Sequence, residues 1–297
     1  MKPIIIVHGG AGDIPQSRVQ GKLDGVRLAV KEGYKQLVNG GSALDAVETA
    51  VVSMEKDEQF NAGYGSVLNL GGEVEMEASI MCGKNLDVGA VTLIKDFPHP
   101  ISIARKVLSD SPHSLLGADG AKMFALEKGF KTVPPQSLIS QHAKDALQKF
   151  LKHGEFGRTE IGAMDEGGVG TVGAVAVDAN GRIAVATSTG GMSGKAVGRI
   201  GDTPQIGSGT YADDNIGGVS TTGIGKIYIS VNFRIAIRQQ ARMTSRLKNT
   251  AGAITLSKDG DVGVHFTSNR MAWAYVKDDK IFYGIDHGQV LAEEINQ

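Results

Sequence analysis

Short apolar runs and helical stripes of apolar residues alternate along this chain, and glycine-rich turns separate them. The apolar run Ile4–Val7 predicts a buried strand that opens into a glycine loop. Between Leu23 and Leu37, apolar residues recur with helical spacing, and Asn39-Gly40-Gly41 ends the pattern. Ser42 and Asp45 resemble a capping box, so a second helix is expected to begin there.

Strand-like and helical patterns then come in blocks rather than in strict alternation. A strand-like stretch, 65–94, is followed by helical patterns near 101–108, 120–126 and 140–151. The segment 153–170 is polar, glycine-rich and aperiodic, which is typical of a mobile linker. Blocks of this kind favour stacked layers over a strictly alternating α/β fold. Further strands are predicted at 172–177, 182–187, 253–256, 262–266 and 281–284.

Composition excludes several classes of protein. The 297 residues can bury a large core in one or two domains, and the net charge of −1 gives no sign of a nucleic-acid or membrane partner. No apolar run approaches the ~18 residues of a membrane span. Cys82 is the single cysteine, which excludes an internal disulfide and favours a reducing, cytoplasmic location. The apolar start before His8 is too short for a signal peptide.

The strongest chemical candidate is Thr171, which stands where the polar segment meets an apolar strand. A hydroxyl is a weak nucleophile, but a threonine with a free α-amine carries its own base. This chemistry requires the chain to cut itself between Gly170 and Thr171. The freed amine has an ordinary pKa of about 7.7–8.0, close to the working pH of a general base.

Other interpretations of the same residues are weaker. Gly168, Gly170 and Gly173 satisfy part of a dinucleotide-binding motif, but that motif needs a strand before it and a helix after it. His8 is a candidate general base, but it lies in a glycine loop, and the expected role of this loop is the shape of its backbone near the cut. Cys82 is expected to be a core or turn residue, and the other histidines lack metal-ligand spacing.

Eight stretches of the chain occur in the order found in one family. The chain resembles the plant-type asparaginase/isoaspartyl dipeptidase family of self-cleaving N-terminal-nucleophile hydrolases. The matching stretches are 7–12, 60–63, 65–68, 73–81, 170–175, 186–192, 198–202 and 220–223.

The resemblance implies a fold and an activity. The fold is a single α/β (α+β) domain, 1–297, built as a four-layer αββα sandwich and cleaved into 1–170 and 171–297. The activity is release of aspartate from L-asparagine and from β-aspartyl dipeptides, with no cofactor for catalysis. A homodimer of cleaved heterodimers is expected.

The resemblance also assigns roles to residues. Thr189 tunes the nucleophile, Thr222 and Gly223 form the oxyanion hole, and Asn61 holds the new amine of Thr171. Arg199 and Asp202 clamp the α-carboxylate and α-ammonium of the substrate, for which a guanidinium fork and a carboxylate are suited. The implied substrate-binding set is Arg199, Ile200, Gly201, Asp202, Thr222, Gly223, Ile224 and Gly225. Main-chain carbonyls for a structural sodium ion are implied at Met54, Glu55, Asp57, Phe60, Ala62 and Tyr64.

Two features depart from the family pattern. Ile224 and Lys226 stand where the family usually has polar and acidic residues beside the oxyanion hole. The segment 234–250 is also shorter than two helices and a turn require. These departures leave open a catalytically silent, uncleaved homologue that acts as a binding or scaffold protein. A glycosylasparaginase-like hydrolase and a threonine aspartase are further alternatives.

Overall fold

The computed structural model describes residues 2–153, 170–223 and 250–295. The predicted linker, apart from its two ends, and the two departures near 224–249 lie outside these residues. Five α-helices are described: α1 (Gln16–Val38), α2 (Ala43–Glu55), α3 (Pro100–Asp110), α4 (Ala118–Glu127) and α5 (Gln141–His153).

Thirteen described strands form two sheets. The large sheet has the order β13-β12-β11-β1-β5-β6-β2-β3-β4, and the small sheet has the order β10-β9-β8-β7. The strands of the large sheet are β1 (Ile4–Gly12), β2 (Met76–Cys82), β3 (Val88–Ile94), β4 (Leu115–Gly117), β5 (Val172–Val177), β6 (Ile183–Thr189), β11 (Arg270–Lys277), β12 (Lys280–Asp286) and β13 (Leu291–Glu294). Those of the small sheet are β7 (Thr210–Asp213), β8 (Gly217–Gly223), β9 (Ala251–Ser257) and β10 (Val262–Phe266).

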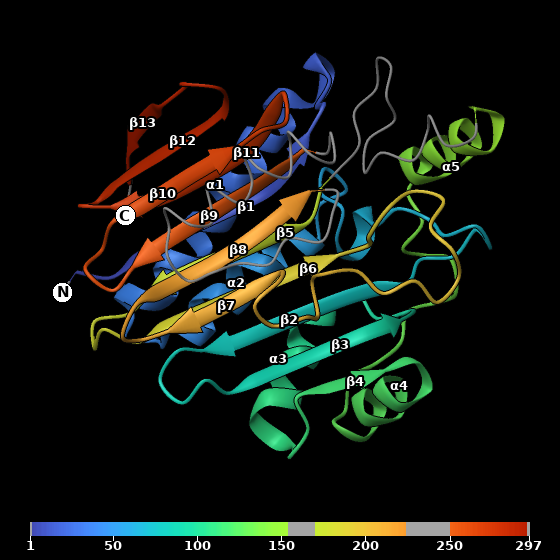
Figure 1. Ribbon diagram of the computed structural model, residues 1–297, viewed down its shortest axis with the longest axis horizontal. Helices are drawn as coiled ribbons and strands as arrows, with labels where there is room; N and C mark the ends of the chain where they lie inside the picture. Colours follow the sequence, from blue (N-terminus) through green and yellow to red (C-terminus); the bar gives the residue numbers. More distant parts are fainter. Residues whose placement is uncertain (1, 154–169, 224–249, 296–297) are drawn as a thin grey trace.

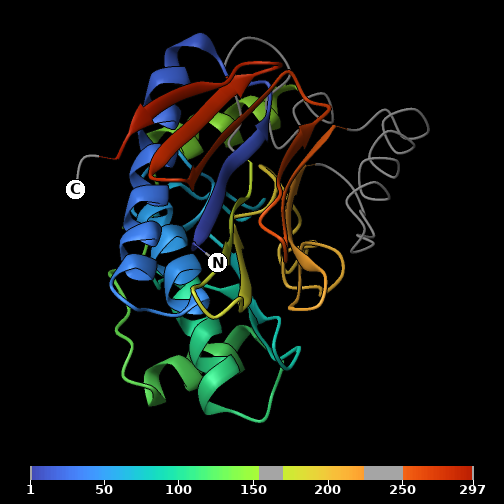
Figure 2. The same cartoon turned by 90° about the vertical axis from the view of Figure 1, so that its left-hand side faces the viewer.

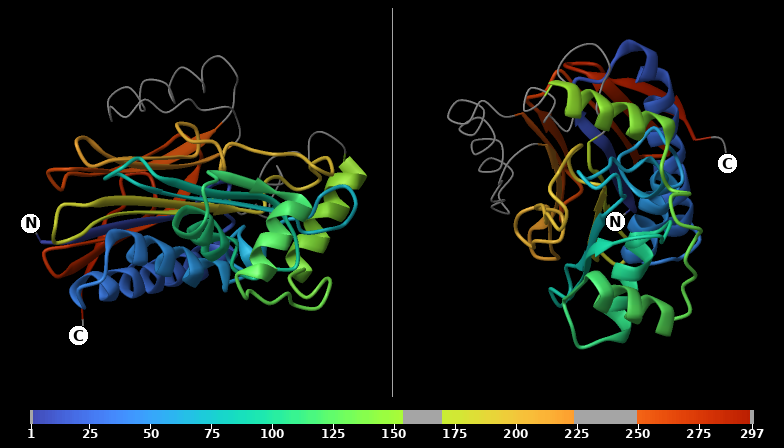
Figure 3. Two further views of the ribbon diagram at one scale, coloured as in Figure 1. Left: turned by 90° about the horizontal axis from the view of Figure 1, so that it is seen from below. Right: turned by 90° about the vertical axis from the view of Figure 1, so that its right-hand side faces the viewer.

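The described elements stack in layers (Figures 1 and 2). Helices α1 and α2 cover one face of the large sheet, and the small sheet lies against its other face (Figure 2). The view from below shows the same order (Figure 3). The helical layer and both facing sheets of the predicted αββα sandwich are therefore present.

The central strands explain why this sequence forms a sandwich. β1 and β5 are buried along their whole length, because each has a helical layer on one face and a second sheet on the other. Alternate residues of β1 accordingly enter two different cores. Ile5 and Val7 pack with α1 and α2, and Ile4 and Ile6 pack against the small sheet. A continuous apolar run is what such a strand requires.

Most of the predicted elements are confirmed. Ser42 and Asp45 form the capping box at the start of α2, with the Ser42 hydroxyl accepting from the Asp45 amide. The helical patterns near 101–108, 120–126 and 140–151 correspond to α3, α4 and α5. β5 and β6 form the predicted hairpin, in which Val172 pairs with Ser188.

Two details differ from expectation. β1 continues through the predicted glycine loop to Gly12, because β11 pairs with that stretch across a register shift. The first part of 65–94 is not a strand: β2 begins only at Met76. The segment before it carries a short 3-10 turn, Gly63–Gly65, and tight turns built on side chains such as Asn69. Among the described helices, none is long and apolar enough to span a membrane.

Candidate active site

Thr171 lies immediately before β5, in the centre of the large sheet, and its side chain is buried. The β5–β6 register places it beside Thr189, the last residue of β6. The Thr171 hydroxyl donates a hydrogen bond of 3.1 Å to the Thr189 hydroxyl. That same oxygen of Thr189 accepts the Gly191 amide at 3.0 Å. The two threonines that the sequence proposed as partners are thus brought together in space.

Gly170, on the other side of the proposed cut, is enclosed by backbone. A methyl group on Gly170 would lie 2.8 Å from both the Thr222 hydroxyl and the Ala11 amide nitrogen. Gly10 has a φ of +96°, and a methyl group there would lie 2.6 Å from the Gly170 backbone. The Thr222 hydroxyl, at the end of β8, accepts the Ala11 amide at 3.4 Å. The ends of β1 and β8 therefore meet at the peptide bond that Thr171 would attack.

Gly223 is the last residue of β8 and has a φ of +132°. A side chain at this position would meet the backbone of Ala251 and Thr250 on the neighbouring strand. Its predicted oxyanion-hole amide is next to Thr222 in sequence. Ile224 and Gly225, the other predicted contacts at this end of the substrate site, lie outside the described residues.

Asn61 stabilises the turn that follows Thr189. Its side-chain nitrogen donates to the Gly191 carbonyl at 2.7 Å, and its side-chain oxygen accepts the Val67 amide at 3.0 Å. The Gly190 amide in turn donates to the Asn61 carbonyl. These contacts fix the turn from which Thr189 reaches Thr171. The predicted contact of Asn61 with the freed amine of Thr171 stays a prediction.

The predicted clamp lies on the loop 198–202. The Arg199 guanidinium is close to the turn after Thr189, since a methyl group on Gly191 would lie 2.9 Å from one of its nitrogens. Burial raises the pKa of Asp202 to about 6, the neighbouring Glu77 carboxylate adds to this, and Arg199 opposes it. The side chain of Ile200, which was also predicted to contact the substrate, is half-exposed. Arg199 and Asp202 are thus electrostatic neighbours, and Arg199 lies beside the turn that follows Thr189.

The charged groups beneath this loop were not predicted from the sequence to have a role. Lys195 is buried, its ammonium donates to the Glu75 carbonyl at 2.6 Å, and burial lowers its pKa to about 8. Glu77 is fully buried and accepts the Gly201 amide. Their signal was present in the sequence: Glu75 and Glu77 alternate with apolar residues in one matched stretch, and charged residues are rarely buried without a role.

His8 lies on the other side of Thr171, at the start of a chain of buried hydroxyls between the two sheets. Its Nε2 is 2.9 Å from the Ser220 hydroxyl. Burial lowers the pKa of His8 to about 3, and the adjacent Thr171 backbone only partly offsets this. A neutral, enclosed imidazole of this kind supports the backbone at the cut. The chain of hydroxyls beyond Ser220 runs through Thr187, Thr210 and Ser79 to the Thr203 carbonyl.

The predicted sodium loop, residues 54–64, curls back on itself. A side chain on Gly63 would collide with the Glu55 carbonyl oxygen, and one on Gly65 would collide with that of Phe60. Each of these glycines thus leaves room for a main-chain carbonyl oxygen, and oxygen ligands suit a hard cation. The donor set fits sodium. Backbone amides already donate to three of the predicted carbonyls, those of Met54, Asp57 and Ala62. Each of these oxygens has a second lone pair, which is left for a cation.

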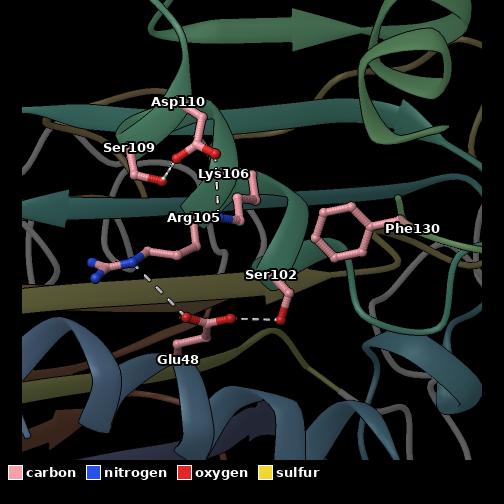
Figure 4. Close-up of a pocket in the computed structure, with 7 residues that line it drawn as sticks. All are labelled: Glu48, Ser102, Arg105, Lys106, Ser109, Asp110 and Phe130. Atoms are coloured by element: carbon pink, nitrogen blue, oxygen red, sulfur yellow. Dashed lines mark hydrogen bonds and ion pairs between the residues drawn. The ribbon is translucent and has the colours of Figure 1, made fainter. Parts of the chain in front are cut away.

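A separate cavity of about 570 Å³ lies beside α2 and α3 (Figure 4). Its charged groups are paired with one another, as in the contact of Lys106 with Asp110 and that of Arg105 with Glu48. It contains none of the predicted site residues, so the proposed chemistry is not there. Its lining residues are Glu48, Ser102, Arg105, Lys106, Ser109, Asp110 and Phe130. Within the described ranges, no cluster of His, Cys, Asp and Glu could hold a metal ion.

Comparisons with known proteins point to the same family as the sequence motifs that contain Thr171 and Thr189. The model of the family Asparaginase_2, described as asparaginase, matches residues 1–285. The chain belongs to the asparaginase family. It is 48% identical to the probable isoaspartyl peptidase/L-asparaginase of Drosophila pseudoobscura pseudoobscura, over 99% of this chain and 98% of that protein. It is 45% identical to the isoaspartyl peptidase/L-asparaginase of Homo sapiens, over 96% of this chain and 97% of that protein.

A third relative has a similar identity and coverage. The Xenopus laevis isoaspartyl peptidase/L-asparaginase is 44% identical, over 97% of both chains. The alignment with the Drosophila pseudoobscura pseudoobscura asparaginase relative extends over 322 positions, although this chain has 297 residues. That relative therefore has segments that are absent here. We expect the shortened stretch after Phe233 to account for part of this difference.

Proposed function

We propose that this asparaginase-family chain is a self-cleaving amidohydrolase that releases aspartate from L-asparagine and from β-aspartyl dipeptides. The observation that carries the proposal is the placement of Thr171. Its buried hydroxyl is bonded to Thr189, and its preceding residue, Gly170, is held between the Ala11 amide and the Thr222 hydroxyl. The names of the relatives, isoaspartyl peptidase/L-asparaginase, support the same activity.

The first step of this proposal is the cut itself. The Thr171 oxygen attacks the carbonyl carbon of Gly170, and the hydroxyl proton passes to the amide nitrogen as the peptide bond breaks. The product is an ester between Gly170 and the Thr171 side chain. Water then hydrolyses this ester, which leaves the Gly170 carboxylate, the Thr171 hydroxyl and a free α-amine. The chain would become residues 1–170 and 171–297.

Turnover repeats the same chemistry on a substrate. The free amine of Thr171 accepts the proton of its own hydroxyl while the oxygen attacks the β-carbonyl of the substrate. The Thr222 hydroxyl and the Gly223 amide would donate to the resulting oxyanion, and removal of one such donor typically costs about 2.7–4 kcal/mol. Ammonia or an amino acid leaves with the proton, and water hydrolyses the aspartyl ester.

Arg199 and Asp202 give this reaction its substrate class. A free α-carboxylate is suited to the guanidinium of Arg199, and a free α-ammonium is suited to the carboxylate of Asp202. Both charges are present in L-asparagine and at the amino end of a β-aspartyl dipeptide. Gly201 belongs to the loop itself, and Ile224 and Gly225 remain proposed contacts of the substrate.

Three further properties belong to the proposal. The carbonyls of the loop 54–64 would hold a structural sodium ion, which would stiffen the segment that carries Asn61 and supply no step of the reaction. The active form would be a homodimer of cleaved heterodimers. The single cysteine, Cys82, supports a cytoplasmic location.

The decisive experiment combines mass with activity. The intact mass of the purified chain, measured under denaturing conditions after a week at neutral pH, should resolve into pieces of 170 and 127 residues. The second piece should begin at Thr171, and the protein should then release ammonia from L-asparagine. Thr171→Ala should stay whole and inactive. A processed and active Thr171→Ala protein would refute the proposal, and an uncut, inactive parent chain would favour the silent homologue.

A further inference from the structure

The substrate loop 198–202 is held from below by two glutamates of one stretch of chain. The Glu77 carboxylate accepts the Gly201 amide with both oxygens, at 2.8 and 3.1 Å. The Glu75 carboxylate accepts the Gly198 amide at 3.1 Å. Each glutamate therefore binds a backbone amide at one end of the segment that carries Arg199 and Asp202. These contacts fix the spacing of the two clamp residues.

Glu77 also links this loop to the nucleophile. It lies on β2, directly opposite Thr189 in the register of β2 with β6. Thr189 is the residue that accepts the hydroxyl of Thr171. One fully buried side chain thus stands next to both halves of the site. Glu75, by contrast, lies just before β2, and its carboxylate pairs with Lys95 at 3.5 Å.

A buried carboxylate needs compensation, and the groups around Glu77 supply it. Burial raises its pKa, and Lys195, the Gly201 amide, Arg199 and the Thr92 hydroxyl lower it. Lys195 is itself buried and donates to the Glu75 carbonyl. The positive charge of Arg199 stabilises the ionised forms of both carboxylates, Glu77 and Asp202. The negative charge of Glu77 acts directly on the charge of Asp202.

We propose that Glu77 is the positioning residue of the substrate clamp: it holds the loop through the Gly201 amide and places a negative charge beside Asp202. The inference rests on the proposed function, because it assigns a role within that same site. Both carboxylate oxygens of Glu77 accept the Gly201 amide, so the role assigned to Glu77 is to position the clamp. Burial is the main reason that the pKa of Asp202 rises to about 6, and the negative charge of Glu77 adds to it, so the clamp becomes fully charged only near neutral pH. A charge-neutral residue at 77 should make the clamp competent at lower pH.

The test measures binding rather than turnover, because the Thr171 amine has its own titration, ordinarily near 7.7–8.0. The probe is L-aspartate, used as a competitive inhibitor of L-asparagine hydrolysis by the cleaved protein. Between pH 5 and 7 the charges of L-aspartate stay fixed. In the parent chain, the affinity should fall as the pH drops through about 6, because Asp202 takes up a proton and loses its attraction for the ammonium.

Two variants separate the two roles of Glu77. Glu77→Gln keeps an oxygen for the Gly201 amide and removes the charge, so the midpoint of the affinity profile should move to lower pH. Glu77→Asp keeps the charge but is one methylene shorter, so the midpoint should stay while the affinity falls about tenfold at all pH values. Glu75→Gln is the matched control, and it should leave the midpoint unchanged.

The outcomes distinguish this inference from the proposed function. If the parent chain neither hydrolyses L-asparagine nor binds L-aspartate, the proposed function itself fails. If the parent chain is active and Glu77→Gln has the parent midpoint, the inference is wrong. An equal shift in Glu75→Gln would also overturn it, because a general charge effect would then explain the profile. Should Glu77→Gln not fold, parent-like affinity in Glu77→Asp would overturn the positioning role.

Discussion

The hydroxyl of Thr171 is bound to that of Thr189 across the β5–β6 hairpin, and the Thr189 oxygen also accepts the Gly191 amide. Because one lone pair of the Thr189 oxygen accepts the Gly191 amide and the other accepts the Thr171 hydroxyl, the Thr189 proton points away from both. The arrangement aligns the Thr171 hydroxyl before any substrate arrives. It also makes Thr189 a sensitive position, since its neighbour is the proposed nucleophile.

Replacement of Thr189 by valine should therefore lower turnover with little change of shape. The loss of one hydrogen bond to the nucleophile, with the Gly191 amide left unpaired, is expected to cost about 1–3 kcal/mol, which corresponds to a loss of roughly five- to 160-fold in kcat. The measurement is kcat per mole of cleaved chain. Thr189→Ser keeps the hydroxyl and should retain most of the activity. Equal losses in both variants would contradict the role of the hydroxyl.

Gly10 should control the cut, because its backbone has a φ of +96° and a methyl group would meet Gly170 at 2.6 Å. Gly10→Ala is expected to slow the appearance of the 170- and 127-residue pieces at neutral pH. Gly40→Ala is the matched control: its φ is +86°, so the conformational cost is similar, but nothing lies within 4 Å of the added methyl group. Parent-like cutting in Gly10→Ala would argue against the enclosure of Gly170.

The ionised carboxylate of Asp202 should lower the free energy of unfolding at neutral pH. Its pKa in the folded chain is about 6, above the ordinary value of 3.8, so the folded state binds its proton more tightly than the unfolded state. Stability from this group is present below pH 3.8 and is lost as the pH rises through 6. Asp202→Asn should thus stabilise the chain by about 1–3 kcal/mol at pH 7.5.

That gain should nearly vanish at pH 4, where Asp202 is mostly protonated in the folded chain. Urea unfolding at the two pH values measures it, in a Thr171→Ala background so that one unbroken chain unfolds. Asp259→Asn, on a side chain that is 71% exposed, is the control and should change little. A destabilised Asp202→Asn at pH 7.5 would show that the carboxylate is structurally required.

His8 should make the fold sensitive to acid. Its pKa falls from 6.5 to about 3 on burial, so the unfolded chain binds a proton that the folded chain refuses. Stability from this group is present above pH 6.5 and is lost as the pH falls toward 3, by about 1.4 kcal/mol per pH unit. His8→Gln should reduce that slope in urea unfolding between pH 7 and pH 5. The exposed His113→Gln should keep it.

A sodium ion in the loop 54–64 should stabilise the chain by mass action, by about 2.7 kcal/mol at a hundred times its dissociation constant. The measurement compares thermal unfolding in sodium chloride with that in choline chloride at equal ionic strength. Gly63→Ala, which crowds the Glu55 carbonyl, should lose the difference. Identical unfolding in the two salts would exclude the ion.

Part of this site could be predicted from the amino-acid sequence alone. Thr171 stood out because a threonine after Gly170 begins a buried strand, and the β5–β6 hairpin follows from a turn signal that fixes its register. That register alone places Thr189 beside Thr171. The helices were equally local, since apolar spacing and the Ser42–Asp45 capping box specify α1 and α2 before any packing.

The sequence did not disclose β7 or β8, because strands rich in glycine or polar residues resemble turns until neighbouring strands pair with them. The prediction also missed β11, although its apolar and aromatic residues are typical of a strand. Nor did it disclose the roles of Glu77, Lys195 and His8. Their importance depends on burial and on partners far away in the chain, such as the 124-residue separation between Glu77 and Gly201.

The sequence by itself thus determined the local elements and the pair of threonines, because helical spacing, turn chemistry and hairpin register act over a few residues. The tertiary structure decided which distant groups surround that pair. It brought Gly10 and Thr222 against Gly170, and it placed Glu77 under the clamp. These contacts arise from the stacking of two sheets, where burial converts ordinary polar residues into a charged and hydrogen-bonded site.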